Sequence, residues 1–230
     1  ILGRRATEPA GELIELSAPP RALDAAAVPV SLALAPALVP HVRTVWVVVD
    51  ENPVPLAATL RPGPAGDLRA LSMRLRVDAY TNLHAVAETA DGRLLETVRF
   101  VKAAGGCSAP FTGDLQAARA RMGRMRLQLP DGSPAPDRPV PVQVALSHPN
   151  TSGLQMDQLT RFSIPAEYVH TLRVSYRGAE VLLVEAGISI AENPTFGFTL
   201  AGEPGGELRV AAEDNRDRRF EAAWTLGATG

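Results

Sequence analysis

The chain of 230 residues contains a single cysteine, Cys107, so no internal disulfide can form. In an exported protein a lone cysteine is a free reactive thiol or an intermolecular link, whereas in a cytosolic protein it is more often a buried, inert residue. Lysine is almost absent, with Lys102 standing among arginines, and the formal net charge is −2. This weak charge excludes the basic surface that binds nucleic acid or an anionic membrane.

Long apolar runs are also missing. The most apolar region, residues 28–49, is interrupted by Pro29, Pro36, Pro40, His41 and Arg43. It therefore lacks the roughly 20 apolar residues that a membrane span needs. The chain begins at Ile1 rather than Met, which is consistent with removal of a signal peptide or with a trimmed N-terminus.

Residues that break regular structure are plentiful, since 20 prolines and 19 glycines are spread along the chain. This spacing favours many short strands joined by turns. Alternation of apolar and polar residues supports the same conclusion. The predicted strands are 13–16, 28–35, 42–49, 56–60, 71–78, 83–88, 94–101, 125–129, 140–147, 169–176, 181–185, 195–200, 208–212 and 220–224. About seven strands in each half predict an all-β fold of two immunoglobulin-like β-sandwich domains in tandem.

The segment between the two halves differs from both. Residues 114–121 are expected to form a short helix capped by Thr112 or Asp114, and Gly123 is expected to end it. We therefore expect one sandwich domain at residues 1–111, a linker at 112–123 and a second sandwich domain at 124–230.

Weak internal similarity also supports two related halves. The tripeptide 51–53 matches 192–194, the segment 64–69 matches 204–209, and residues 86–100 align with 210–224 without gaps. Few identities are shared, so the sequence indicates a tandem repeat without defining it. Asn52 and Asn193 precede prolines, and each is expected to shape a local turn through its own backbone.

The most informative tract follows the last predicted strand of the first half. Cys107 comes after Gly105 and Gly106 and is followed by Ser108, Ala109 and Pro110. Such small residues have little surface to bury, so we expect an exposed arm with the thiol at its tip. The thiolate is the nucleophile, and at an ordinary pKa of about 8.5 a few per cent would be ionised near neutral pH. The tract predicts a covalent attachment site; the alternative is a cysteine that merely fills a core.

No other constellation predicts chemistry. The histidines His41, His84, His148 and His170 lack metal-ligand spacing, and no nucleophile elbow or phosphate-binding loop is present. His148 with Met156 suggests a soft copper site, but a turn explains the pair better. We expect no catalytic residue, no metal and no cofactor, and therefore no enzyme acting alone.

Several tracts together resemble a known family. The first half resembles SoxY in residues 49–53, 74–78 and 105–107, and the second half resembles SoxZ in residues 147–149, 151–153, 164–166, 189–194 and 214–215. The resemblance covers nearly the whole chain and implies a fused SoxY–SoxZ sulfur carrier. By motif position, Cys107 corresponds to the carrier cysteine and Gly105 and Gly106 to the glycines before it.

The resemblance implies an exported, periplasmic carrier that holds a sulfur intermediate, such as one derived from thiosulfate, on a thiol. Its partners would be periplasmic sulfur-oxidation enzymes. A fused subfamily of this kind is associated with quinoprotein dehydrogenases, which use pyrroloquinoline quinone. A disulfide-linked dimer through Cys107 is a further partner state that an unpaired thiol allows.

The chain departs from the family after the cysteine, where Ser108, Ala109 and Pro110 replace a second pair of glycines. The arm also continues into a second domain, so it is tethered at both ends, and Pro110 restricts its backbone. The alternative function is a non-covalent docking module for a periplasmic redox enzyme, with the sandwich surface as the binding site.

Overall fold

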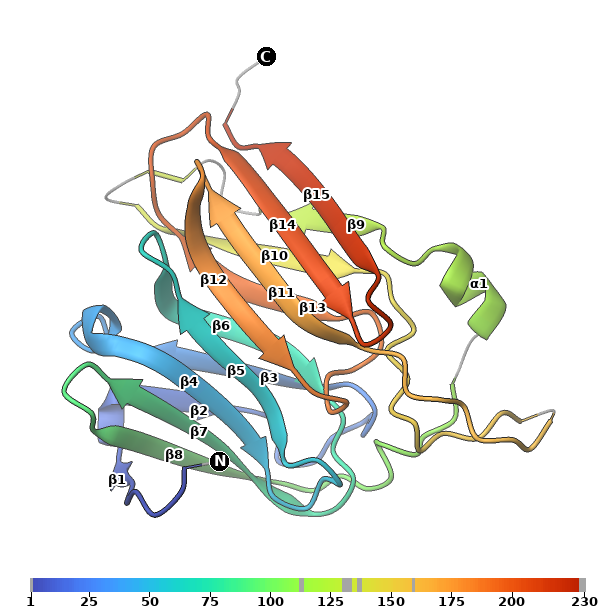
Figure 1. Cartoon of the computed structure of the whole chain (residues 1–230). Helices are drawn as coiled ribbons and strands as arrows, with labels where there is room; N and C mark the ends of the chain where they lie inside the picture. Colours follow the sequence, from blue (N-terminus) through green and yellow to red (C-terminus); the bar gives the residue numbers. More distant parts are fainter. Residues whose placement is uncertain (1, 112–113, 130–133, 136–137, 159, 228–230) are drawn as a thin grey trace.

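The computed structural model describes residues 2–111, 114–129, 134–135, 138–158 and 160–227. Two sheets stack face to face along the whole molecule (Figure 1). Side chains alternate between the buried and exposed faces of most strands; in β3 (Val28–Leu34), for example, every second residue is buried. The predicted all-β sandwich architecture is confirmed.

The first half supplies the strands β1 to β8. Their bounds are β1 Glu8–Pro9, β2 Ile14–Ser17, β3 Val28–Leu34, β4 Val42–Val49, β5 Leu56–Pro62, β6 Asp67–Leu75, β7 Thr81–Thr89 and β8 Leu94–Val101, with single 3-10 turns at Gly11–Leu13 and Val39–His41. The sequence predicts each of these strands within a few residues except β1. β1 contains just two residues and pairs in parallel with β8.

The second half supplies β9 to β15. Their bounds are β9 Met125–Gln128, β10 Val140–Leu146, β11 Val169–Tyr176, β12 Ala179–Ala186, β13 Thr195–Leu200, β14 Glu207–Asp214 and β15 Arg219–Thr225. The hairpin between β11 and β12 turns through Arg177 and Gly178, which both have positive φ. Positive φ at both central residues is the turn geometry that suits the twist of a two-residue hairpin.

Both sheets are continuous across the two halves. The larger sheet has nine strands in the order β1-β8-β7-β4-β5-β12-β11-β14-β15, and the smaller has six in the order β2-β3-β6-β13-β10-β9. The halves meet where β5 pairs with β12, with Leu60 opposite Val184, and where β6 pairs with β13, with Ser72 opposite Gly197. We call this junction the seam. The apolar core runs through it without interruption.

Strand order reveals an approximate two-fold relation between the halves. From the seam outward, β5, β4, β7 and β8 correspond to β12, β11, β14 and β15, while β6, β3 and β2 correspond to β13, β10 and β9. The aligned segments 86–100 and 210–224 occupy equivalent hairpins. The other two proposed matches do not: Asn52 follows β4 and Asn193 follows β12, and Pro64 precedes β6 whereas Pro204 precedes β14. Those similarities do not reflect the repeat.

The expected helix of the linker is present. α1 spans Leu115–Ala120, and the Asp114 side chain caps it by accepting hydrogen bonds from the backbone N–H groups of Gln116 and Ala117. Thr112, the other proposed cap, lies outside the described residues. Within the described parts of the chain, no helix is long and apolar enough to cross a membrane. The use of residues 112–123 as a domain boundary stays a prediction.

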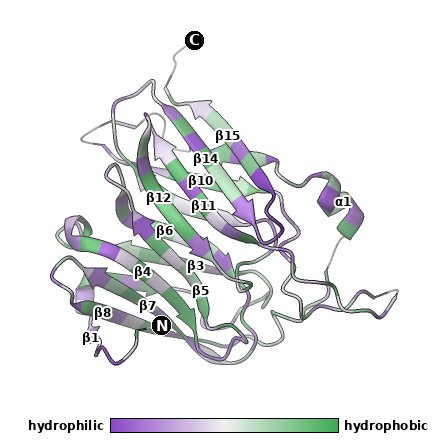
Figure 2. Ribbon diagram, viewed as in Figure 1, coloured by the Kyte–Doolittle hydropathy of each residue, from purple (hydrophilic) through white to green (hydrophobic). Residues whose placement is uncertain are grey.

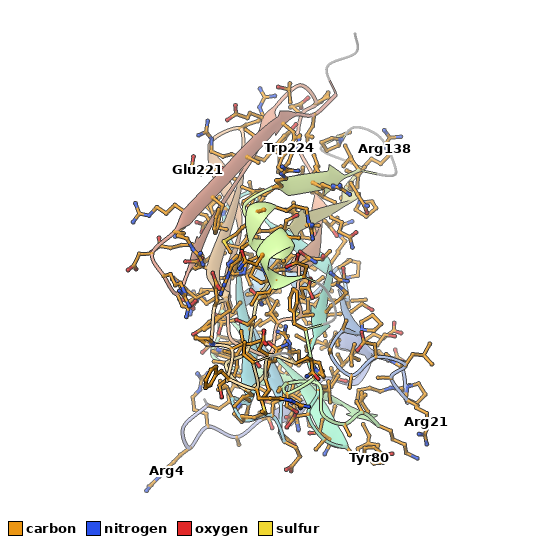
Figure 3. All side chains as sticks on the ribbon, turned by 90° about the vertical axis from the view of Figure 1, so that its right-hand side faces the viewer. Arg4, Arg21, Tyr80, Arg138, Glu221 and Trp224 are labelled. Atoms are coloured by element: carbon orange, nitrogen blue, oxygen red, sulfur yellow. The ribbon has the colours of Figure 1, made fainter. Side chains whose placement is uncertain are left out.

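Hydropathy follows the sandwich. Apolar side chains concentrate along the central strands, whereas α1, the connecting loops and the outer edges carry more polar residues (Figure 2). Figure 3 looks along the sandwich from the side where α1 lies, with Tyr80 and Arg21 near one end and Trp224 and Glu221 toward the other. The segment between β8 and α1 contains Cys107.

Candidate functional site

Cys107 is buried, not exposed. Its relative solvent exposure is 0%, although it does not belong to the main apolar cluster. The expectation of an exposed thiol at the tip of a free arm is therefore wrong for this conformation. The physical reason is that hydrogen bonds from both halves to the backbone of residues 105–109 hold these small residues against the protein. We call residues 103–111 the arm.

The first half holds the arm through residues just after β6. The N–H of Gly105 donates to the carbonyl of Asp78 (2.7 Å), and the N–H of Gly106 donates to the carbonyl of Val77 (3.1 Å). The N–H of Cys107 donates to the Asp78 carboxylate, at 3.0 Å from Oδ1. Asp78 therefore accepts from the arm with both its backbone and its side chain, which fixes the orientation of Cys107.

The second half holds the arm from the other side. The hydroxyl of Ser152 donates to the carbonyl of Cys107, and the amide of Gln155 donates to the carbonyl of Ala109 (2.9 Å). Ser152 and Gln155 are both almost fully buried. In Figure 1 the pale green chain leaving β8 runs to the side where the gold segment of the second half lies. The thiol is thus enclosed between the two halves at the seam.

The two glycines have separate geometric roles. Gly105 has a φ of +74°, a region that residues with a side chain rarely adopt. At Gly106 a Cβ atom would lie 2.1 Å from the carbonyl oxygen of Ala25 and 2.6 Å from that of Val77. Both oxygens belong to the backbone and cannot move aside easily. The Gly-Gly pair is therefore required for docking of the arm, not simply for its freedom.

Asn52 organises the surface on which the arm rests. Its Nδ2 donates to the carbonyl of Arg76 (2.7 Å) and to the hydroxyl of Ser189 (2.9 Å), while its Oδ1 accepts from the N–H of Asp78 (2.8 Å). Asn52 is buried, and its side chain joins residues of both halves. The expectation that it bonds its own backbone in a turn is wrong. It positions the residues that hold Cys107.

Burial suppresses ionisation of the thiol. Loss of water and the nearby Asp78 carboxylate raise the pKa of Cys107 to about 11, and the Arg76 charge opposes this only in part. A thiol with such a pKa is almost entirely protonated near neutral pH and is a poor nucleophile. In the docked arrangement Cys107 is therefore chemically protected.

The histidines do not assist Cys107. In His148 the Nδ1 accepts from the N–H of Asn150 (3.0 Å) and the Nε2 lies 3.2 Å from Asp214 Oδ2. Both ring nitrogens are thus engaged in a buried network, which excludes the imagined copper site with Met156 in this structure. His84 lies between Glu96 and Asp50 on strands β7, β8 and the end of β4. Among the described residues, no cluster of three or more potential ligands could hold a metal ion.

The remaining predicted arm residues lie at its outer side. Ser108 and Pro110 are exposed, and Ala109 is half-buried. Sequence reasoning identified the arm but missed the groups that hold it, namely Val77, Asp78, Ser152 and Gln155. A signal was available, because all except Gln155 fall inside or beside the tracts that carry the family resemblance, at residues 74–78 and 151–153.

Fold and site together define a class of protein: a tandem pair of immunoglobulin-like β-sandwiches with a single cysteine on a Gly-Gly arm at their seam. Comparison with protein families identifies the members of the pair. Residues 1–107 match the family described as "Sulfur oxidation protein SoxY", and residues 128–225 match "Sulphur oxidation protein SoxZ". The chain is therefore a fused SoxY–SoxZ-like protein.

Solved structures give weaker similarities. The sulfur carrier protein SoxY from Chlorobium limicola f thiosulfatophilum is 26% identical over 44% of this chain and 86% of that chain, with a TM-score of 0.35. A glycosyl hydrolase family 2 member from Bacteroides cellulosilyticus is 11% identical over 88% of this chain and 24% of its own, with a TM-score of 0.26. A Salmonella alpha-2-macroglobulin mutant is 15% identical over 96% of this chain and 15% of its own, with a TM-score of 0.27. No curated protein matches the chain.

Proposed function

We propose that the protein is a non-catalytic periplasmic carrier that holds a covalent sulfur intermediate on Cys107 for partner enzymes of sulfur oxidation. The family assignment of both halves supports a role in sulfur oxidation. The observation that supports the carrier role is the placement of the chain's one thiol on a Gly-Gly arm held by just a few polar contacts.

Loading of Cys107 requires the arm to leave the seam. In the docked arrangement the thiol is buried and protonated, so it cannot meet a partner enzyme. Release breaks the hydrogen bonds to Asp78, Val77, Ser152 and Gln155, each worth about 1 kcal/mol net because water competes for the same groups. The released thiol regains an ordinary pKa of about 8.5, and its thiolate fraction near neutral pH rises to a few per cent.

The covalent step has a defined electron balance. If thiosulfate is the sulfur source, the Cys107 thiolate and thiosulfate form a new S–S bond and release two electrons. The product is a cysteine-bound thiosulfonate that keeps one negative charge. The partner must therefore be an oxidising enzyme with an electron acceptor of its own, because this chain has one cysteine and no second thiol to oxidise.

Intact-mass measurement on protein from its native host tests the carrier role. We expect a sulfur-containing mass increment on wild-type protein that a reducing agent removes, and none on the Cys107→Ser variant. A bare chain mass under all growth conditions, with sulfur compounds supplied, contradicts the proposal.

A second candidate is a non-covalent docking module for a periplasmic quinoprotein dehydrogenase. Burial of Cys107 favours it, and so do the exposed apolar side chains of Leu154, Met156 and Phe162 close in sequence to Ser152 and Gln155. If this function is correct, Cys107→Ser protein retains partner binding in a pull-down, whereas Phe162→Ser loses it. The carrier proposal predicts instead that Cys107→Ser abolishes sulfur oxidation in the host.

A further inference from the structure

Arg76 is the most unusual charged residue near the arm. It is 2% exposed, and its Nη1 donates across the seam to the carbonyls of Ile188 (3.2 Å) and Ile190. Its Nε is buried and has no hydrogen-bond partner. No carboxylate among the described residues forms an ion pair with it. The fold therefore buries a guanidinium whose charge is not neutralised by an adjacent anion.

Such an arrangement is unfavourable unless something compensates it. Burial of a cation without a paired anion costs several kcal/mol, and unsatisfied buried polar atoms are rare in native proteins. Burial lowers the pKa of Arg76, but an arginine stays charged near neutral pH. The carbonyls of residues 188 and 190 solvate one end of the guanidinium and leave its Nε unused.

The position of Arg76 relates it to Cys107. Arg76, Val77 and Asp78 are consecutive, and the latter two accept the hydrogen bonds of Gly106 and Cys107. The positive charge of Arg76 acts on the arm's sulfur, because it favours the ionised form of the Cys107 thiol. The unneutralised cation therefore belongs to the segment that holds the arm and its thiol.

We propose that Arg76 is an anion-binding residue for the group attached to Cys107, so that the docked arm retains negatively charged sulfur adducts in preference to neutral or cationic ones. This inference rests on the proposed carrier function and deepens it by naming the residue that recognises the charge of the cargo. A terminal thiosulfonate or persulfide anion would supply both the missing charge and an acceptor for the free Nε. Charge-assisted hydrogen bonds to arginine are about twice as strong as neutral ones.

The surrounding carboxylates set the size of the preference. Asp78 lies beside the thiol and disfavours negative charge there, although it accepts the N–H of Cys107. Glu192 and Asp24 interact with Arg76 at longer range. The attraction from Arg76 must outweigh Asp78, so replacement of Asp78 by its neutral amide should increase the preference for an anion.

Synthetic adducts of different charge test the proposal, and the anionic and cationic adducts are similar in size. At alkaline pH the Cys107 thiolate attacks the sulfenyl sulfur of a methanethiosulfonate reagent, which forms a mixed disulfide and releases methanesulfinate. Reagents with 2-sulfonatoethyl, 2-hydroxyethyl and 2-(trimethylammonio)ethyl groups give an anionic, a neutral and a cationic adduct. Hydrogen exchange of the amides of residues 105–107 then reports docking, because these amides are hydrogen-bonded in the docked arm.

We expect at least about tenfold slower exchange for the anionic adduct than for the cationic one in wild-type protein, a ratio that corresponds to a little over one kcal/mol. Arg76→Met should abolish this difference, and Arg76→Lys should preserve part of it. Asp78→Asn should enlarge it, which keeps a test available if Arg76→Met does not fold. Equal exchange for all three adducts, whether because all dock or because none does, overturns the proposal.

Failure of this inference and failure of the carrier function are distinguishable. The adduct series uses reagents that need no partner enzyme, so it measures charge preference even if cells never load Cys107. The native mass measurement detects loading even if Arg76 has no preference. If Arg76 serves only to join the two halves, its replacement changes the stability of every adduct equally. The ratio of the hydrogen-exchange rates between the anionic and cationic adducts is then one.

Discussion

Gly106 decides, as a single residue, whether the arm can dock. A methyl group at this position meets the backbone oxygens of Ala25 and Val77 at distances that no side-chain rotation relieves. Overpacking of this kind costs roughly 1–3 kcal/mol, which corresponds to a shift of about 5- to 150-fold in a two-state equilibrium. We predict that Gly106→Ala raises the rate at which Ellman's reagent labels Cys107 by a factor in this range.

Gly178→Ala provides the matched control. Gly178 lies in the β11–β12 hairpin far along the chain, and a Cβ atom there meets nothing within 4 Å. Unlike Gly106 it has positive φ, so Gly178→Ala adds backbone strain at a remote site without a clash at the arm. Labelling rates that rise equally in both variants would contradict the assignment of Gly106 to docking.

His84 and His148 should give opposite pH dependences of stability. Burial lowers the pKa of His148 despite its contact with Asp214, so its folded state binds fewer protons than the unfolded chain. Its contribution is present above the unfolded pKa of 6.5 and is lost as pH falls below it. Partial burial opposes protonation of His84 as well, but hydrogen bonds to Glu96 and Asp50 outweigh it and raise the pKa. The stability that His84 contributes is therefore present below the unfolded pKa of 6.5 and is lost as pH rises through the higher pKa of the folded state.

Urea unfolding between pH 5 and pH 8 checks this pair. His148→Gln should flatten the loss of stability on the acidic side of 6.5, and His84→Gln should flatten the loss on the alkaline side. Each slope change is bounded by about 1.4 kcal/mol per pH unit, the value for one proton. Identical pH profiles for wild-type and variant proteins would show that these histidines do not titrate on folding.

At this scale the sequence identifies residue types but not their surroundings. Cys107 and its glycines stand out because they are chemically unusual in their tract. The sequence does not reveal that the thiol is buried. The hydrogen bonds that hold the Cys107 backbone are made with Asp78 and Ser152, which lie 29 and 45 positions away in the chain. Such long-range polar contacts leave no local periodic signal.

Among the elements, α1 depends on one capping residue. Asp114 satisfies two backbone N–H groups at its N-terminus, and Arg119 joins the helix to the buried Glu167 of the second half. We predict that Asp114→Ala costs about 1 kcal/mol and increases hydrogen exchange within residues 115–120. Gln116→Ala, at an exposed position of the same helix, keeps the cap and should leave exchange nearly unchanged. Protection that survives Asp114→Ala would show that the Arg119 ion pair alone holds the helix.

Strands were far easier to predict than the relations between them. In β4, β8, β11 and β13 the expected and observed bounds agree, because strand-forming residues there lie between turn-forming segments. β1 has two exposed residues and therefore offers no alternation to detect. The sequence does not show that β5 pairs with β12 or that β6 pairs with β13. Each of these four strands would fit equally well at the edge of a separate sandwich.

For the molecule as a whole, continuous sheets predict that the two halves stay together without a covalent link. A protease site inserted into residues 112–123 and cleaved after purification should leave the halves associated in size-exclusion chromatography at micromolar concentration. Backbone pairing at the seam and the shared core provide the reason. Separation of the halves into two stable monomers would contradict it and would favour independent domains with boundaries at 111 and 124.

The two-ended attachment of the arm also limits the shape of its partners. The arm is anchored by the β-bridge of Lys102 to Arg21 at one end and by the Asp114 cap of α1 at the other. When released it forms a loop with roughly six residues on each side of its tip, which extends about 20 Å at most. A loop enters a channel as two chains side by side, so a channel that accepts this thiol must have a wider and shallower mouth than one shaped for a free chain end.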